Sequence, residues 1–249
     1  MAASSTIVLI TGANSGIGLA TSGVIASASD KYHVIMASRN IENGEKVLEE
    51  VRSMPDIKGE LSSIQLDVND PELISRAANE VQQKFGRLDV LVNNAGRGFN
   101  EMNQETLQST FLTNATGPVL VSEAFKPLLL KSQDPRSIYV SSGLGSLSIA
   151  SDKKHKDYAI DYVPYRMSKA ALDMWVIQEA KQMDGKLKVF AMCPGLVVSN
   201  LRGTSEEARN AGGYAGSPLV SGETILSIVE GKRDADVGKF VHKDGVYEW

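Results

Sequence analysis

Tyr165 and Lys169 are two residues whose types and spacing could perform proton chemistry together. They stand four positions apart in an amphipathic stretch that predicts a helix, so both side chains share one face. A free phenol has a pKa of about 10, which is too high for efficient proton exchange near neutral pH. A neighbouring ammonium favours the phenolate, and we therefore expect Lys169 to lower the pKa of Tyr165. Without further motifs, a tyrosine and a lysine at this spacing are more often an ordinary surface pair.

A glycine-rich loop near the start of the chain could bind phosphate. It consists of Thr-Gly-Ala-Asn-Ser-Gly-Ile-Gly over residues 11–18, follows an apolar run at 6–10 and opens a helical stretch at 17–27. Glycine lets the backbone approach a diphosphate, and a helix N-terminus offers free N–H groups to an anion. A plain glycine-rich turn is the alternative, but strand, loop and helix occur in the order of a dinucleotide-binding unit. The residues expected to contact the cofactor here are Gly12, Asn14, Ser15, Gly16, Ile17 and Gly18.

Ser38 and Arg39 bear on which dinucleotide is bound. They end the next apolar run, about twenty residues beyond the loop. An acidic residue at this point would hydrogen-bond the adenosine ribose hydroxyls and select NADH. A guanidinium can instead pair with the 2′-phosphate of NADPH through charge-assisted hydrogen bonds. Arg39 therefore predicts NADPH as the cofactor, with a solvated surface charge as the alternative.

Further motifs complete a pattern in which both order and spacing are specific. Asn-Asn-Ala-Gly occupies residues 93–96, Ser142 follows, and Tyr-Arg-Met-Ser-Lys occupies 165–169. Together with the glycine-rich loop, they resemble the short-chain dehydrogenase/reductase family over nearly the whole chain, and the tail through Trp249 is similar to carbonyl-reductase-like members. The resemblance implies cofactor contacts at Asp67, Val68, Asn93, Ala95, Gly96, Tyr165, Lys169, Pro194, Gly195, Val197 and Ser199.

The resemblance also implies catalytic roles in the reduction of a ketone or aldehyde carbonyl. Tyr165 would be the general acid, or the general base for the reverse oxidation of a secondary alcohol, and Lys169 would also hold the nicotinamide ribose. Ser142 would hydrogen-bond the substrate carbonyl; strand alternation lets only one of Ser141 and Ser142 face the cleft, and the family register favours the second. Asn114 would extend a proton relay from the lysine through a bound water.

Other residues of the pattern would line the cofactor. In this family the pair at 67–68 lies beside the adenine and the pair at 194–195 beside the nicotinamide. Ser199 occupies a position where a hydroxyl often faces the nicotinamide carboxamide. Asn93 is expected to be structural rather than catalytic, pinning neighbouring strand ends and lining the cofactor cleft.

The elements that position these residues alternate regularly. Short runs that are apolar almost throughout are typical of strands covered on both faces, as in a parallel sheet. Their alternation with amphipathic stretches predicts a single-domain α/β protein over 1–249, a Rossmann-type doubly wound parallel sheet with helices on both faces. We expect strands at 6–10, 33–37, 61–66, 90–92, 137–140, 188–192 and 238–242, and helices at 17–27, 41–53, 71–85, 104–130, 164–183 and 222–230.

Charge, cysteine and histidine content exclude several classes of function. The net charge of −4 argues against general affinity for nucleic acid or an anionic membrane. Cys193 is the single cysteine, so no intrachain disulfide can form and a reducing compartment is expected. The start of the chain lacks a basic segment and a long apolar run, so we expect a cytoplasmic protein without a signal peptide or membrane span. His33, His155 and His242 are scattered, and no metal site is expected.

Two long connections, 143–163 and 197–217, interrupt the alternation. The first is an insertion that places Ser142 and Tyr165 23 positions apart, more than in compact family members. It precedes the helix through which many relatives associate, so monomer and homodimer both stay open. The second is expected to form a flap over the substrate.

The substrate is not identified by these motifs. Pocket shape would be set by the two connections and by residues 97–100, and steroids, quinones, polyketide-type aromatics and small aldehydes all fit. Tyr158 and Tyr162 could pack over the cleft and favour a bulky or aromatic ketone. Two other functions also use such motifs, namely dinucleotide sensing without turnover and a non-redox step such as dehydration. The complete set of Ser142, Tyr165 and Lys169 weighs against the sensor.

Overall fold

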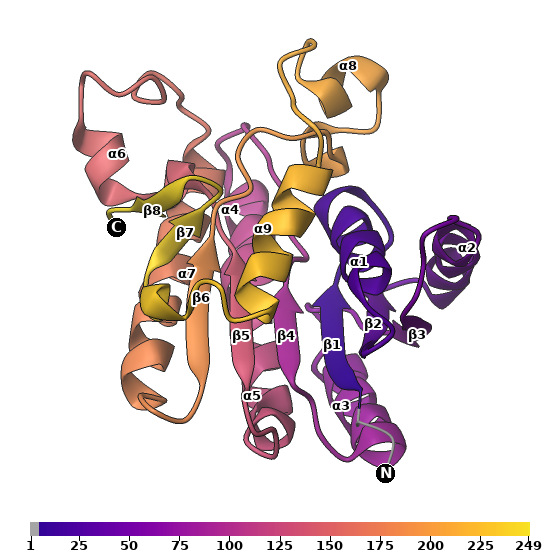
Figure 1. Cartoon of the computed structure of the whole chain (residues 1–249). Helices are drawn as coiled ribbons and strands as arrows, with labels where there is room; N and C mark the ends of the chain where they lie inside the picture. The colour runs from indigo at the N-terminus through magenta and orange to yellow at the C-terminus, as the bar shows by residue number, and fades with distance from the viewer. Residues whose placement is uncertain (1–4) are drawn as a thin grey trace.

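The computed structural model describes residues 5–249 and contains an eight-stranded sheet in the order β3-β2-β1-β4-β5-β6-β7-β8 (Figure 1). The strands from β3 to β7 pair in parallel, whereas β8 is antiparallel to β7. The order runs outward in both directions from β1 and β4, which confirms the predicted doubly wound α/β fold. The strands are β1 (Thr6–Thr11), β2 (Tyr32–Ser38), β3 (Glu60–Gln65), β4 (Val90–Asn93), β5 (Arg136–Val140), β6 (Lys188–Met192), β7 (Phe240–His242) and β8 (Gly245–Tyr247).

Helices cover both faces of the sheet (Figure 1). One apolar cluster joins the sheet to α1, α2 and α9, and a second joins it to α3, α5 and α7. The helices of the described chain are α1 (Gly16–Ala28), α2 (Ile41–Arg52), α3 (Pro71–Phe85), α4 (Gln104–Phe111), α5 (Gly117–Leu129), α6 (Leu147–Ser151), α7 (Val163–Gln182), α8 (Glu206–Asn210) and α9 (Leu219–Val229), with short turns η1 (Leu112–Thr116), η2 (Gly143–Gly145), η3 (Asn200–Arg202) and η4 (Asp234–Asp236).

Strand β1 shows why the strand sequences are apolar throughout. Successive side chains of a strand point to opposite faces, and here both faces are covered. Val8 and Ile10 belong to the cluster beneath α1 and α9, whereas Ile7 and Leu9 belong to the cluster beneath α3 and α5. A strand with one solvated face would have shown alternation instead.

The predicted helix at 104–130 is interrupted in the structure. Residues Leu112–Thr116 form a π-helical turn between α4 and α5, in which the N–H of Gly117 donates to the carbonyl of Leu112. Pro118 has no N–H, so the usual bond to the carbonyl of Asn114 four residues earlier cannot form. Glycine is also required at 117, because a Cβ there would lie 2.8 Å from the carbonyl oxygen of Val68. The turn directs the buried Asn114 inward.

The carboxyl ends of the strands carry the long connections. The segments that contain α6 and α8 both stand above this edge of the sheet (Figure 1). Residues 1–4, which belong to the stretch examined for a signal peptide, lie outside the described residues. Among residues 5–249, no helix combines the length and apolar character needed to cross a membrane.

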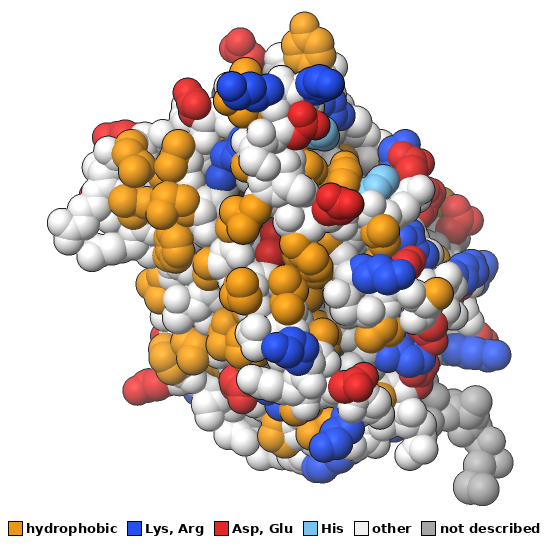
Figure 2. Space-filling model, turned by 90° about the vertical axis from the view of Figure 1, so that its left-hand side faces the viewer, with side chains coloured by type: hydrophobic (Ala, Val, Ile, Leu, Met, Phe, Trp, Pro, Cys, Tyr) orange, Lys and Arg blue, Asp and Glu red, His pale blue; other side chains and the backbone are white. Residues whose placement is uncertain are grey.

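Exposed apolar side chains gather on the side of the molecule shown in Figure 2. Helix α7 presents Met167 and Met174 to solvent, and α5 presents Leu120. A second copy packed against these side chains would remove them from water.

Candidate active site

The glycine-rich loop packs tightly against the end of β4. Gly12 and Gly16 have φ values of +65° and +56°, which favour glycine. A Cβ at Gly12 would lie 3.0 Å from Cα of Ala95, and one at Gly18 would lie 2.6 Å from both the carbonyl oxygen of Gly12 and the side-chain amide nitrogen of Asn94. The loop therefore needs glycine at these positions to reach the neighbouring strand end.

The first turn of α1 fits an anion. Ser15 precedes it with extended backbone, and no side-chain capping bond or acidic residue is found in this turn. In contrast, α2 is capped by Asn40 and α3 by Asp70. Uncapped N–H groups at the positive end of a helix are suited to a diphosphate. Helices α7 and α9 also start without a side-chain cap, so the first turn of α1 is distinguished by the glycine-rich loop that leads into it.

Asn94, rather than Asn93, ties β4 to β1. Its side-chain amide donates to the carbonyl oxygens of Thr11 and Gly12, at 2.8 and 3.2 Å, and its backbone N–H donates to the Thr11 hydroxyl. The side-chain atoms of Asn93 are buried and have no hydrogen-bond partner within the described chain. The expectation that Asn93 pins the strand ends through its side chain is therefore wrong, because the residue directly after β4 makes these contacts instead.

The four residues predicted to be catalytic come together at the carboxyl edge of the sheet. Tyr165 and Lys169 lie on α7, Ser142 follows β5, and Asn114 lies in the π-helical turn. Nζ of Lys169 lies 5.7 Å from the centre of the Tyr165 ring and donates to the carbonyl oxygen of Val140. A Cβ at Gly96 would lie 3.4 Å from Oδ1 of Asn114 and 3.9 Å from Nζ of Lys169. Residues far apart in sequence therefore converge on one point.

The side chain of Asn114 is held by three hydrogen bonds. Its Oδ1 accepts from the N–H of Arg97, and its Nδ2 donates to the carbonyl oxygen of Arg97 and to the hydroxyl of Ser168. The side chain therefore links the β4–α4 loop to α7. The main-chain carbonyl of Asn114 is a further acceptor, because Pro118 has no N–H and cannot supply the usual helical donor.

The pKa of Tyr165 differs from the sequence expectation. The side chain is 6% exposed. Burial raises its pKa above the ordinary value, and a side-chain hydrogen bond with Ser142 acts in the opposite direction. The expected net lowering of this pKa is therefore wrong in direction, because the loss of water around the phenol outweighs the other effects. The phenol stays protonated at neutral pH.

Ser141 and Ser142 point to different partners, as strand alternation requires. Ser142 interacts with Tyr165 and accepts a hydrogen bond from the N–H of Leu144. Ser141 is buried and donates to Oδ1 of Asp173. Asp173 was not among the predicted site residues, although it stands four positions after Lys169 in the chain.

The residues expected at the adenine end lie at the same edge of the sheet, beyond the glycine-rich loop. Arg39 is exposed directly after β2, and its carbonyl oxygen accepts a hydrogen bond from Gln65. Asp67 accepts from the N–H of Asn69, and Val68 packs against Gly117. The exposed guanidinium is free of the sheet core and can reach an anion outside it.

The residues expected at the nicotinamide end begin the flap. Pro194 and Gly195 follow β6, and Val197 forms a bridge with Gly216. Ser199 approaches the glycine-rich loop, since its Cβ would lie 3.3 Å from a Cβ at Gly16. The guanidinium of Arg202 ties the segment together by donating to the carbonyl oxygens of Val197, Ala208 and Arg209.

The three segments expected to shape the substrate pocket meet at Tyr162. Its ring lies beside that of Tyr165. A Cβ at Gly98 would lie 3.2 Å from the Tyr162 hydroxyl and 3.1 Å from Cγ of Leu201. The insertion, the β4–α4 loop and the flap therefore touch one another above Tyr165.

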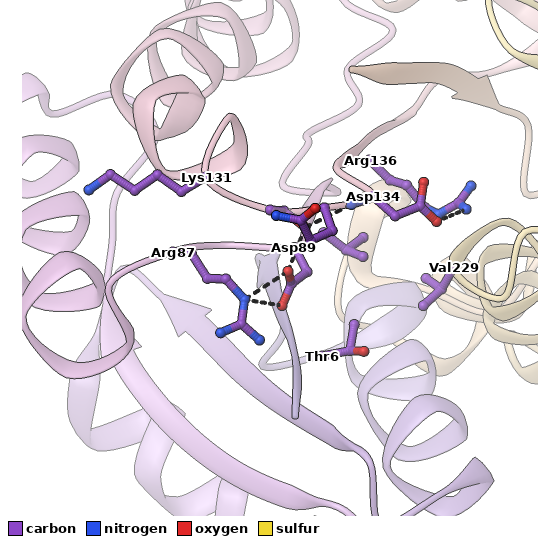
Figure 3. A pocket seen from close by; sticks show the side chains of 10 residues that line it. Thr6, Arg87, Asp89, Lys131, Asp134, Arg136 and Val229 are labelled. Carbon is purple, nitrogen blue, oxygen red and sulfur yellow. Dashed lines mark hydrogen bonds and ion pairs between the residues drawn. The ribbon is translucent and has the colours of Figure 1, made fainter. Parts of the chain in front are cut away.

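A separate cavity of about 430 Å³ lies at the opposite edge of the sheet (Figure 3). Arg87 pairs with Asp89 at 3.0 Å within it, and the buried Arg136 pairs with Asp134 and Asp234. Thr6, Val90 and Arg136 begin their strands, so the cavity marks the amino ends. The candidate catalytic residues lie at the carboxyl ends, where open α/β sheets bind their ligands. In the described chain no group of three or more His, Cys, Asp or Glu residues could hold a metal ion.

Known proteins share both the sequence and the fold. A family model described as short chain dehydrogenase matches residues 6–210. The short-chain dehydrogenase/reductase tropE of Talaromyces stipitatus is 36% identical, over 96% of this chain and 95% of its own. The relative eupG of Phoma sp. is 31% identical, over 98% and 97%. The NADPH-bound carbonyl reductase from chicken fatty liver superposes with a TM-score of 0.83 at 25% identity, over 99% of this chain and 100% of that chain. The chain therefore belongs to the short-chain dehydrogenase/reductase family of oxidoreductases.

Proposed function

We propose that the protein is an NADPH-dependent reductase of ketone or aldehyde carbonyls, able to oxidise a secondary alcohol in reverse. The observation that carries this proposal is the convergence of Tyr165, Ser142 and Lys169 at the carboxyl edge of the sheet, the edge that also carries the glycine-rich loop after β1. A protein that only sensed a dinucleotide would gain nothing from a buried phenol hydrogen-bonded to a serine.

The cofactor would lie along the carboxyl edge of the sheet. The first turn of α1 would hold the diphosphate, and Arg39 would pair with the 2′-phosphate. When bound, the dihydronicotinamide supplies the hydride. The chicken carbonyl reductase that resembles this chain is an NADPH-bound protein, which supports the same cofactor here.

Tyr165 would donate its phenolic proton to the substrate oxygen as the C=O group becomes an alcohol. The phenol is protonated at neutral pH, which is the form that a proton donor needs, although burial also makes it a weaker acid. Ser142 would donate a hydrogen bond to the same oxygen and stabilise its developing charge. A donor of this kind contributes about 3 kcal/mol to transition-state stabilisation in enzymes where one has been removed.

Lys169 and Asn114 would return a proton to Tyr165. Lys169 is an ammonium that contacts the ribose and lies beside the phenol in this proposal. The side chain of Asn114 is occupied by Arg97 and Ser168, so its main-chain carbonyl would hold the relay water. The π-helical turn leaves this carbonyl without the usual helical hydrogen bond, which supports such a role.

The substrate would enter beneath Tyr162 and the flap of residues 197–217. Tyr162 and Tyr165 present neighbouring, inclined rings, and an aromatic or other flat ring ketone would pack against this aromatic pair. The flap would exclude water during hydride transfer. We therefore propose a ring-bearing ketone as the preferred substrate class.

A panel of aromatic ketones, quinones and small aldehydes, followed by loss of NADPH absorbance, tests the function. We expect carbonyl-dependent oxidation of NADPH by the wild-type protein. Tyr165→Phe should lower the rate about a hundredfold or more while NADPH still binds. Turnover of no carbonyl, or full turnover by Tyr165→Phe, would overturn the proposal. Product analysis in the same reactions would reveal a non-redox step.

A further inference from the structure

Asp173 is a buried acidic residue that the mechanism above does not use. It lies on α7, four residues after Lys169 and eight after Tyr165, so the three side chains follow one face of the helix. Its exposed fraction is 5%. Burying a carboxylate is costly unless it is paired, so its presence here calls for a partner of opposite charge.

The carboxylate is fixed between α7, the end of β5 and the turn η2. Oδ1 accepts from the hydroxyl of Ser141, the residue directly before Ser142. Oδ2 is buried and has no hydrogen-bond partner among residues 5–249. A Cβ at Gly145 would lie 2.8 Å from Oδ2 and equally close to Cβ of Lys169, so glycine is required where the turn crosses the helix. The acid therefore sits beneath the turn that carries Ser142.

The charged neighbours of Asp173 define its electrostatic effect. Lys169, one turn earlier on α7, is the cation that interacts with it; its Nζ donates to Val140 and forms no direct ion pair with Asp173 among residues 5–249. Tyr165 on the same helix and Cys193 after β6 are the other titratable groups that interact with it. Ser141 from β5 and Gly145 from η2 carry no charge. Burial lowers the pKa of Lys169 to about 8, and the charge of Asp173 opposes this shift. Burial raises the pKa of Asp173 to about 7.

We propose that Asp173 is a positioning residue that keeps Lys169 in its ammonium form and holds the Ser141–Gly145 segment against α7. The proposal rests on the role given to Lys169 above. The negative carboxylate favours the neighbouring ammonium, and the Ser141 hydrogen bond couples the same acid to the backbone that presents Ser142. One residue thereby sets both the charge of Lys169 and the place of Ser142.

Asp173→Asn tests this role with little change in shape. The amide keeps an oxygen that can accept from Ser141 but carries no charge, so Lys169 should lose its proton at lower pH. We expect the alkaline limb of kcat/KM for NADPH to move down by about one pH unit. The NADPH dissociation constant, measured by fluorescence over the same pH range, should show the same displacement without any turnover.

Ser141→Ala provides a second, milder variant. The Ser141 hydrogen bond favours the ionised form of Asp173. Its loss should therefore move the alkaline limb of kcat/KM for NADPH to lower pH, by less than in Asp173→Asn. If Asp173→Asn does not fold, this variant decides the question. Near-ultraviolet circular dichroism reports folding in each case.

Glu179→Gln is the matched control, because Glu179 is also a buried acid on α7 but contacts Ser122 and Tyr139 instead. Glu179→Gln should alter stability but leave unchanged the pH dependence of kcat/KM for NADPH and that of the NADPH dissociation constant. If the pH dependences of kcat/KM for NADPH and of the NADPH dissociation constant are the same as in wild type in both Asp173→Asn and Ser141→Ala, the inference is overturned. If the wild type binds NADPH but reduces no carbonyl, the proposed function fails. The pH dependence of the NADPH dissociation constant would still test the role of Asp173.

Discussion

The ring of Tyr162 lies beside that of Tyr165, with centroids 5.6 Å apart and planes inclined by 59°. Tyr162 reaches this position with φ 25° and ψ 42°, outside the conformations that most residues prefer. Such strain costs about 1–3 kcal/mol and persists only where the surroundings enforce it. The Tyr162 hydroxyl lies against the backbone of Gly98, where an added Cβ would come within 3.2 Å of it, so a residue larger than glycine at 98 would displace the ring.

Tyr162→Ala should change substrate selection rather than cofactor binding. Loss of the ring removes a stacking surface of about 0.5–1.5 kcal/mol. We expect kcat/KM for an aromatic ketone, relative to a small aliphatic aldehyde, to fall about tenfold, with the NADPH dissociation constant unchanged. Tyr162→Phe retains the ring and should keep the wild-type ratio. An equal loss for both substrates would show that Tyr162 only supports the fold.

Arg39→Asp should move the cofactor preference from NADPH toward NADH. The substitution removes a charge-assisted contact to the 2′-phosphate and introduces repulsion, so kcat/KM for NADPH should fall about tenfold to a hundredfold. The control is Arg76→Asp, which makes the same charge change at an exposed position on α3. Steady-state kinetics with both cofactors measure the ratio. A ratio unchanged from wild type would remove Arg39 from the cofactor site.

The sequence is most informative where one local pattern decides the structure. Strand β1 and the glycine-rich loop were predictable because burial on both faces and the demand for positive φ leave few alternatives. The break at η1 was not predicted, because the apolar period runs through it and Pro118 is compatible with a first helical turn. Strand β8 is three residues long and is defined by its pairing with β7, which no local pattern records.

In the candidate site too, local motifs predicted some features, whereas others depend on packing between distant segments. The grouping of Ser142, Tyr165 and Lys169 followed from motif order. The pKa of Tyr165 did not, because the burial of the phenol depends on contacts between distant segments, among them Tyr162 of the insertion. Asp173 was missed since its partner Ser141 is 32 positions away in the chain and becomes a neighbour only through the packing of α7 on β5.

Asn94→Ala should destabilise the protein more than Asn93→Ala does. The first change deletes two hydrogen bonds to the carbonyl oxygens of Thr11 and Gly12, each contributing about 1 kcal/mol. Asn93 makes no side-chain hydrogen bond within residues 5–249, so its polar atoms contribute none of this stabilisation. Urea unfolding without cofactor compares the two free energies. Equal losses would contradict the assignment of the strand tie to Asn94.

Asp234→Asn should lower stability near neutral pH and have less effect in acid. Asp234 pairs with the buried Arg136 beside the cavity of Figure 3, and this hydrogen bond lowers the pKa of Asp234. A carboxyl whose pKa is lower in the folded state binds its proton less tightly there. Its stabilisation is therefore present above the ordinary pKa of about 4 and disappears as the pH falls through the lowered value.

Asp234 is partly exposed, so solvent screening limits the expected difference between wild type and Asp234→Asn to about 1 kcal/mol at pH 7. Urea unfolding at neutral pH and in steps down through acid measures how this difference declines. Asp244→Asn is the control, because Asp244 pairs with Lys243 at an exposed turn where neither partner is buried. A difference that stayed constant into strong acid would mean that the carboxylate charge is not what Arg136 requires, and that an uncharged oxygen at residue 234 holds the guanidinium equally well.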